Sequence, residues 1–417
     1  MLVLSEAQVR QVLTIEACLV ANRTALQSLS PTNPSNTDTA IVPTRIAIPY
    51  HEEGSNKNDH GDNDANKAKT DNNDNNDWTL FKPASYQEHD NDRGITLNLL
   101  GTKVVSTRAK NSCRAKSIVN STVLLLDAPT GDTLALMKSN YLTAMRTAAG
   151  SALATELCLQ QHSYHRFGSS LSSSSRVNSE GVIRTTSLHL VVFGAGDQAD
   201  LHIKCITFVL KTVAKVTIVN RSLERARKLK ERLLESDHFL SSFRINQGGR
   251  VSGQEQRQGS VVLQTIDCIE LHDTDNVKKV VQDADVIVTA TNTCTPLFDF
   301  NCVKKGCHIN GIGSYTPSMD EVGRSFIQKR CLTVIDTMEA LNVGDLTDIQ
   351  TSSSNFLGLI GALLLDGSER VEDYSLCREE YDCTFFKSVG TAIQDLLTAS
   401  VVYQRAKELG IGTVVHV

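Results

Sequence analysis

The sequence predicts an α/β protein with a central Rossmann-type, doubly wound parallel sheet. The first observation is an apolar, β-branched run, Leu188–Phe193, which leads directly into a G-x-G-x-x-A sequence at residues 194–199. The second is a series of short apolar runs alternating with helical or irregular segments, which is typical of parallel strands joined by crossover connections. These runs are 215–219, 261–267, 285–291, 308–312 and 331–336.

The regions on either side predict further elements. Val3-Leu4 predicts a short strand, followed by a helix that Ser5 and Gln8 cap as a capping box and that ends near Ala25. Strands are predicted at 41–50, 95–106, 119–126 and 133–137. Small residues at 141–158 predict a helix, and the amphipathic pattern at 385–410 predicts a long final helix that Gly410 ends.

Three polar segments interrupt this pattern. Residues 51–77 are dominated by Asn and Asp, and such a composition cannot bury enough apolar surface to offset its ordering entropy. They predict a disordered insertion. The Ser-rich residues 161–187 predict a linker, and the polar residues 236–260 predict a loop insertion.

Composition excludes several classes of function. A chain of 417 residues with 40% hydrophobic and 21% charged residues has an ordinary globular composition, and its net charge of −5 argues against nucleic-acid or membrane-surface partners. The lack of a membrane-length apolar run and of a signal-peptide core predicts a cytoplasmic protein. Eleven scattered cysteines predict reduced thiols, and Cys302 and Cys307 lack the second pair that a zinc site needs. We expect no metal.

The glycine-containing turn predicts a dinucleotide site. Gly194 allows the tight turn, Gly196 lets the backbone approach a pyrophosphate, and Ala199 lets the next helix pack close to the strand. The N-terminus of that helix offers free N–H groups and a partial positive charge to phosphates. The expected cofactor contacts are Gly194, Ala195, Gly196, Asp197 and Gln198.

The end of the next strand predicts which dinucleotide binds. An NAD-specific fold places an acid about twenty residues after the turn, where it holds the ribose 2′-hydroxyl, but this chain has Asn220-Arg221-Ser222, with Arg225 following. Two cations and a hydroxyl suit a 2′-phosphate, so we expect NADPH rather than NAD. The alternative is that Ser222 is a helix N-cap and Arg221 a surface charge.

Other residues carry weaker signals of their own. Thr289 and Thr291 lie at the end of a predicted strand, where ligands of doubly wound sheets bind, although small polar residues also begin turns. Lys103 inside a strand is by itself compatible with simple solvation. Arg146 lies near the start of its helix, where the helix dipole disfavours a cation. It is either an exposed charge or a clamp for an anion.

Taken together, several motifs resemble the ornithine cyclodeaminase/mu-crystallin family. The resemblance extends over nearly the whole chain apart from the polar segments, in the motifs at 142–149, 194–199, 285–291, 306–313, 386–390 and 411–412. It implies a Rossmann domain at 188–340 and a substrate and dimerisation domain of α+β type made from 1–160 and 341–417. It also implies a homodimer.

The resemblance implies roles for individual residues. Arg45, Lys103 and Arg146 fall where the family places cations around the substrate carboxylate and the reacting centre, so Lys103 and Arg146 are also the catalytic candidates. The motifs place Thr147, Lys387 and Ser388 beside the cofactor. Asn220, Arg221 and Ser222 match the NADPH-using, mu-crystallin-like branch.

The sequence also departs from the family pattern. Aligned on Gly313, it has Tyr315 where ornithine cyclodeaminases have an Asp that assists chemistry on the substrate amine, and Ser117-Ile118-Val119 replaces a His-containing stretch found in some relatives. The resemblance therefore implies an NADPH-dependent reductase of small cyclic imino acids. The alternatives are an ornithine cyclodeaminase and a non-catalytic protein that binds NADPH or a small molecule.

Overall fold

The computed structural model forms two compact units, described in turn below. It describes residues 1–30, 39–50, 77–90, 95–114, 116–167, 176–177, 183–184, 187–236, 263–347, 349–365 and 381–416. The predicted insertions 51–77 and 236–260 lie outside these residues, except for Asp77 and Ser236, and so does most of the predicted linker at 161–187. Gln161–Phe167 of that linker are instead the last turns of helix α3, Asn140–Phe167.

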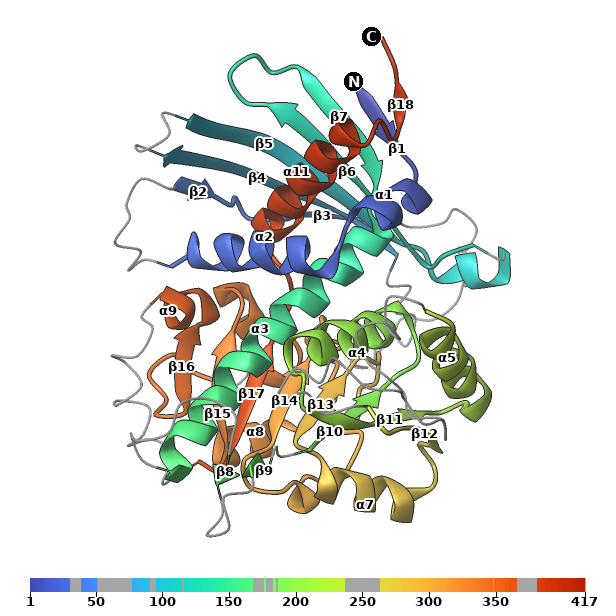
Figure 1. Ribbon diagram of the computed structural model, residues 1–417, viewed down its shortest axis with the longest axis vertical. Helices are drawn as coiled ribbons and strands as arrows, with labels where there is room; N and C mark the ends of the chain where they lie inside the picture. The colour runs from blue at the N-terminus through green and yellow to red at the C-terminus, as the bar shows by residue number, and fades with distance from the viewer. Residues whose placement is uncertain are drawn as a thin grey trace, which may run out of the picture. The chain divides into compact units, whose positions relative to one another are not determined.

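Unit 1 contains both chain ends and comprises 1–13, 37–143 and 395–417. Its sheet runs in the order β18-β1-β7-β6-β5-β4-β2, and β3 also pairs with β4 (Figure 1). All of these pairs are antiparallel except β1 with β7. The strands are β1 Leu2–Leu4, β2 Thr39–Ile41, β3 Ile46–Pro49, β4 Trp78–Asp90, β5 Ile95–Thr107, β6 Val119–Asp127, β7 Thr133–Lys138 and β18 Thr413–Val414.

Helices at both ends of the chain pack in this unit. The predicted capping box is confirmed, since Ser5 and Gln8 hydrogen-bond reciprocally at the start of α1, Glu6–Val12. The single helix predicted up to Ala25 is wrong, because the Thr14 side chain accepts from the Ala17 N–H and starts a separate helix, α2, Ile15–Gln27, which belongs to unit 2. Helix α11, Ala392–Glu408, lies against β5, where a methyl group on Gly101 would come within 2.9 Å of Leu396.

Unit 2, residues 14–36 and 144–394, contains the predicted doubly wound sheet. The order β12-β11-β10-β13-β14-β17-β15-β16 is parallel throughout. From β10 the chain first moves toward β12 and then returns to β13, so the topological switch point lies between β10 and β13. The strands are β10 Leu188–Phe193, β11 Val213–Asn220, β12 Thr265–Glu270, β13 Val286–Thr289, β14 His308–Gly311, β15 Cys331–Ile335, β16 Phe356–Leu359 and β17 Cys383–Lys387.

Helices and short strands complete this unit (Figure 1). The helices are α2, most of α3, α4 Asp197–Val209, α5 Leu223–Glu235, α7 Thr274–Asp283, α8 Arg324–Arg330 and α9 Ile360–Leu365. The short strands β8 Arg176–Val177 and β9 Ile183–Arg184 pair with each other. Every residue of β13, β14, β15 and β17 is buried, as expected for strands covered on both faces.

The predicted last helix is confirmed as α11, with Gly410 after its end, but its predicted start is wrong. Phe385–Lys387 begin the segment predicted as the last helix, but they belong to β17, which pairs with β14 on one side and β15 on the other. The parallel sheet consequently extends past residue 340, where the predicted Rossmann domain ends, and takes in 356–359 and 383–387. The helix itself starts only at Ala392.

Candidate functional site

The glycine turn between β10 and α4 has the geometry that a dinucleotide turn requires. Gly194 has φ +117°, and a methyl group on it would lie 2.6 Å from the Ala290 carbonyl oxygen, so only glycine fits. Gly196 is the N-cap of α4 and is exposed, and no atom lies within 4 Å of where its side chain would be. The start of α4 is therefore open to an anion. These residues fit a bound pyrophosphate.

The end of β11 lies beside this turn. The Gly194 N–H donates to the Val219 carbonyl at 2.9 Å, so Asn220, the next residue, adjoins the turn. Asn220 Nδ2 donates to the Ser222 carbonyl at 3.0 Å, while Arg221 is exposed. The Ser222 hydroxyl accepts from the Arg225 N–H at 3.3 Å, so Ser222 is indeed a helix N-cap, as the alternative interpretation held. No carboxylate occupies residues 220–222.

Thr289 and Thr291 meet a buried carboxylate at the end of β13. Both hydroxyls donate to Glu321, at 3.0 and 2.7 Å, and the N–H groups of Thr291 and Gly313 each donate to it at 2.7 Å. Burial raises the pKa of Glu321, while the charge of Lys387 and the two hydrogen bonds from Thr291 act in the opposite direction. Thr289 also pairs with Phe193, directly before the glycine turn. The two threonines thus lie at the switch point, with Glu321 fixing their orientation.

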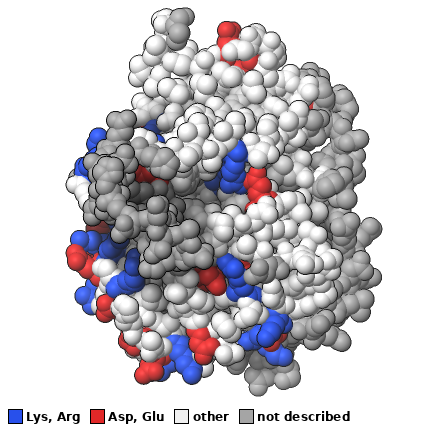
Figure 2. All heavy atoms as spheres, turned by 180° about the vertical axis from the view of Figure 1, so that it is seen from behind, with Lys and Arg blue, Asp and Glu red and all other residues white. Residues whose placement is uncertain are grey.

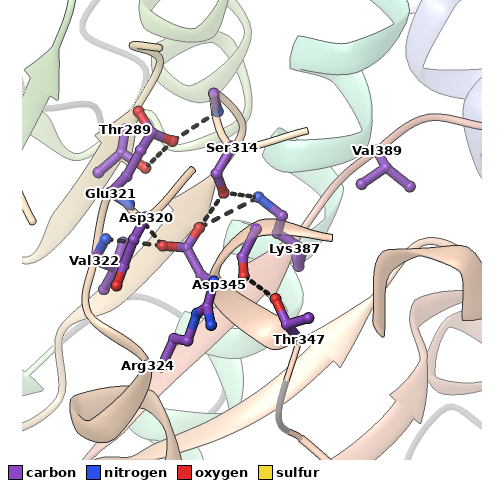
Figure 3. A network of polar contacts seen from close by, with 12 residues as sticks. Thr289, Ser314, Asp320, Glu321, Val322, Arg324, Asp345, Thr347, Lys387 and Val389 are labelled. Carbon is purple, nitrogen blue, oxygen red and sulfur yellow. Dashed lines mark hydrogen bonds and ion pairs between the residues drawn. The ribbon is translucent and has the colours of Figure 1, made fainter. Parts of the chain in front are cut away.

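A second buried network holds the loop after β14 (Figure 3). Lys387, Ser314 and Asp345 come from three separate segments, and all three are fully buried. Lys387 Nζ donates to the Ser314 hydroxyl and lies 3.3 Å from Asp345 Oδ2, to which Ser314 also donates. The Asp345 Oδ1 atom accepts from the N–H groups of Glu321 and Val322, at 2.7 and 3.0 Å.

This network determines the charge of Asp345. Burial alone would raise the pKa of this carboxyl, but the Lys387 ammonium, the Ser314 hydroxyl and the Val322 N–H together hold it below its ordinary value. Since Asp345 also binds the N–H of Glu321, the Lys387 and Glu321 networks are continuous. Together they fix residues 312–323, the loop that carries Tyr315.

Unit 1 holds one of the predicted catalytic residues in a buried ion pair. Lys103, on β5, places its Nζ 2.6 Å from Asp395 Oδ2 and 3.4 Å from the Thr143 hydroxyl. Lys82, directly opposite Lys103 on β4, lies 3.8 Å from the same oxygen. All three charged side chains are at least nine-tenths buried. Two ammonium groups thus lie within 4 Å of one carboxylate oxygen.

The remaining predicted residues occupy both units. Arg45 lies in unit 1, half-buried in the connection before β3. Arg146 and Thr147 lie on α3 in unit 2, with 4% and 6% of their surfaces exposed. Arg146 is therefore not the exposed charge that one interpretation of the sequence allowed. Ser388 follows β17, and its hydroxyl donates to Asp336 Oδ2 at 2.8 Å.

Sequence reasoning did not identify Lys82, Ser314, Asp345 or Asp395 as parts of these clusters. One signal was present for Asp395, which is the only charged residue between Lys387 and Arg405. A lone acid in an apolar helix is costly to bury without a cation nearby. Lys82 has no comparable local signal, because its position opposite Lys103 depends on the register of two strands.

Neither a metal site nor a membrane-spanning helix is found in the described parts of the chain. Among those residues, no group of three or more His, Cys, Asp or Glu side chains could hold a metal ion, and no helix is long and apolar enough to cross a membrane. On the face shown in Figure 2, basic and acidic side chains lie next to one another.

Known proteins are similar to this chain in sequence. The family model for the ornithine cyclodeaminase/mu-crystallin family matches residues 47–166 and 250–410. A Delta(1)-pyrroline-2-carboxylate reductase of Bacillus cereus is 28% identical over 317 residues, which cover 76% of this chain and 80% of the relative. The ketimine reductase mu-crystallin of Rattus norvegicus is 28% identical over 306 residues, 73% of this chain and 75% of the relative.

A solved structure resembles the whole fold. The Delta(1)-pyrroline-2-carboxylate reductase of Thermococcus litoralis, in complex with NADH and L-proline, aligns with a TM-score of 0.66 at 21% identity and covers 100% of both chains. Because the family model matches well over half of the sequence, the chain belongs to the ornithine cyclodeaminase/mu-crystallin family.

Proposed function

We propose that this chain is an NADPH-dependent reductase of small cyclic imino acids, such as pyrroline- or piperideine-2-carboxylate. The observation that carries the proposal is the open glycine turn at the switch point, beside a strand end that has Arg221 and no carboxylate. The similarity to pyrroline-2-carboxylate and ketimine reductases supports the substrate class. Reduction adds a hydride to the imine carbon and a proton to the nitrogen.

The cofactor would be held by unit 2. Gly194 would form the turn, since its own N–H is bound to the Val219 carbonyl, and the backbone N–H groups from Ala195 to Gln198 would bind the pyrophosphate. The Asp197 contact would be through its backbone, since its carboxylate repels phosphate. The 2′-phosphate would be surrounded by Asn220, Arg221, Ser222 and Arg225. An acidic side chain at this place would repel that phosphate, and this chain has none at residues 220–222. When bound, the nicotinamide supplies the hydride.

Residues at the strand ends would position the reactive end of the cofactor. Thr147, Thr289 and Thr291 would contact it, the last two through hydroxyl oxygens whose protons already point to Glu321. Ser388 would contribute its hydroxyl oxygen in the same way. Lys387 would act through Ser314, because its ammonium group is bound to Ser314 and Asp345 inside the protein.

Three cations would bind and orient the substrate. Arg45 and Arg146 would bind the carboxylate, for which a guanidinium offers two parallel donors. Lys103 would lie at the reacting centre, with Asp395 holding its ammonium group in place. Orientation is a large part of what such a site supplies, so we propose Lys103 and Arg146 as the catalytic residues. A homodimer and a cytoplasmic location complete the proposal and can be tested by light scattering and by imaging a tagged chain.

Three assays separate this function from its alternatives. Purified protein should consume NADPH when a cyclic imino acid is added. Tight NADPH binding without turnover of any such substrate would favour a binding protein. Ammonia release from ornithine with NAD would favour a cyclodeaminase, against which Tyr315 argues, since its phenol replaces the Asp that cyclodeaminases carry.

A further inference from the structure

The turn between β17 and α11 is held by one buried carboxylate. Asp336, directly after β15, is 1% exposed. Its Oδ2 atom accepts from the Ser388 hydroxyl at 2.8 Å and from the N–H groups of Val389 and Gly390 at 3.0 and 2.7 Å. Three donors on one oxygen fix both the backbone and the first side chain of the turn.

The other side of the turn is fixed as well. The Thr391 N–H donates to Gln394 Oε1 at 3.0 Å, and the Gln394 N–H donates to the Thr391 hydroxyl at 3.3 Å, a reciprocal pair at the start of α11. Gln394 Nε2 also donates to Asn22 on α2 at 3.0 Å. Gly390 is thus clamped between two sets of buried hydrogen bonds.

The backbone of Gly390 contacts the Arg146 guanidinium. Gly390 has φ +73°, and a methyl group on it would lie 2.6 Å from Arg146 Cζ and closer still to Nη1. Glycine therefore leaves the space that the guanidinium occupies. Arg146 is 4% exposed, so a guanidinium displaced by that methyl group would have to shift within buried surroundings.

We propose that Asp336 and Gly390 are positioning residues, which fix the Arg146 guanidinium so that it presents its donors to the substrate carboxylate. The inference rests on the proposed function, in which Arg146 binds that carboxylate. An arginine side chain has considerable rotamer freedom, and binding is tighter when that freedom is removed in advance. Asp336 fixes the turn, and the bare Cα of Gly390 sets where the guanidinium lies.

The test compares Gly390→Ala and Asp336→Asn with a matched control. Gly131 has φ +76° but no atom within 4 Å of where its side chain would be, so Gly131→Ala introduces the same backbone strain away from Arg146. With NADPH and pyrroline-2-carboxylate, we expect Gly390→Ala to lower kcat/KM about 100-fold, mainly through KM, because misplacement by about 1 Å costs that much. Asp336→Asn should lower it about tenfold, and Gly131→Ala should leave it unchanged.

A binding measurement shows whether the effect passes through Arg146. The ligand is pyrrole-2-carboxylate, an analogue of the substrate pyrroline-2-carboxylate. It is titrated calorimetrically, in the presence of NADPH, into the wild type, Gly390→Ala, Arg146→Met and the double variant. We expect Gly390→Ala to weaken binding in the wild type and to have no further effect in Arg146→Met, as required for residues that act as one unit. NADPH affinity should be the same in all four proteins.

The possible outcomes are distinct. The positioning role is overturned if Gly390→Ala weakens pyrrole-2-carboxylate binding equally in the wild type and in Arg146→Met. It is also overturned if Gly390→Ala and Asp336→Asn both bind pyrrole-2-carboxylate as tightly as the wild type. Either result leaves Arg146 as a carboxylate ligand. If the wild type neither binds pyrrole-2-carboxylate nor reduces pyrroline-2-carboxylate, the proposed function fails and the positioning role fails with it.

Discussion

Replacing Lys387 with Met tests the buried ionic network most sharply. The change removes an ammonium group 3.3 Å from Asp345 where both side chains are fully buried, and Met retains most of the apolar volume. Breaking a buried ion pair from one side costs about 3–5 kcal/mol, because the remaining charge stays desolvated. Asp345 would keep its bonds from Ser314, Glu321 and Val322, so we expect the lower end, about 3 kcal/mol.

The matched control is a surface pair of the same chemistry. Lys228 lies 2.6 Å from Glu224 on α5, and both side chains are more than two-thirds exposed. Water and salt screen such a pair, so Lys228→Met should leave stability unchanged within error. Urea unfolding at pH 7 measures both variants. Far-UV circular dichroism follows the whole chain, and the fluorescence of Trp78, the only tryptophan, follows unit 1.

The pH dependence has a defined sign. The pKa of Asp345 is lowered in the folded wild type, so its pairing stabilises the protein above the unfolded value near 3.8 and is lost as pH falls through the lower, folded value. Without Lys387, burial raises the pKa of Asp345. The stability gap between wild type and Lys387→Met should therefore narrow as pH falls from 7 toward 4. Two results would refute this role of the buried ion pair. One is that Lys387→Met lowers the free energy of unfolding no more than Lys228→Met does, and the other is that the loss caused by Lys387→Met does not change with pH.

Three further predictions concern other groups. Burial lowers the pKa of His202 to about 4, so the folded protein keeps this imidazole neutral. The free energy of unfolding should fall as pH drops from 6.5 toward 4, by about 3 kcal/mol from this group, and His202→Gln should flatten the titration in that range. Burial raises the pKa of the Cys205 and Cys307 thiols well above the ordinary value, so both should react with DTNB only after unfolding, whereas the exposed Cys294 should react at once. Arg221→Ala should weaken NADPH binding by roughly 1.5–3 kcal/mol and leave NADH binding nearly unchanged, as titration calorimetry would show.

Each of these has a contrary result. A stability curve that His202→Gln leaves unchanged in shape would mean that the histidine is not held neutral. Reaction of all described thiols at one rate would contradict their burial. Equal losses of NADPH and NADH affinity in Arg221→Ala would remove the argument for a 2′-phosphate site.

Local pattern was sufficient for several elements in both units. The strand 188–193, the turn after it and Ser5 with Gln8 each depend on residues that are adjacent in sequence, so their physical demands can be read directly. Phe385–Lys387 were predicted as helix but form a strand. A short apolar run has no period that separates a buried strand from a helix, and here tertiary pairing with β14 and β15 decided the outcome.

The buried charge clusters could not be predicted, because their members are far apart in sequence. Lys103 and Asp395 are 292 positions apart, and their 2.6 Å contact exists only because α11 returns to the sheet of unit 1. That Lys387 acts beside the cofactor stays a prediction, and the hydrogen bond and ion pair that its ammonium group makes with Ser314 and Asp345 could not be foreseen from the sequence. The sequence indicated which residues are chemically important, and the tertiary structure determined which partners they have.

The most direct test of the account is a single assay of the purified chain. NADPH absorbance is followed after pyrroline-2-carboxylate is added, with NADH in a parallel sample. We expect consumption of NADPH in proportion to the imino acid added, formation of proline, and a higher kcat/KM with NADPH than with NADH. No loss of NADPH with pyrroline- or piperideine-2-carboxylate, from a protein that binds NADPH tightly, would contradict it.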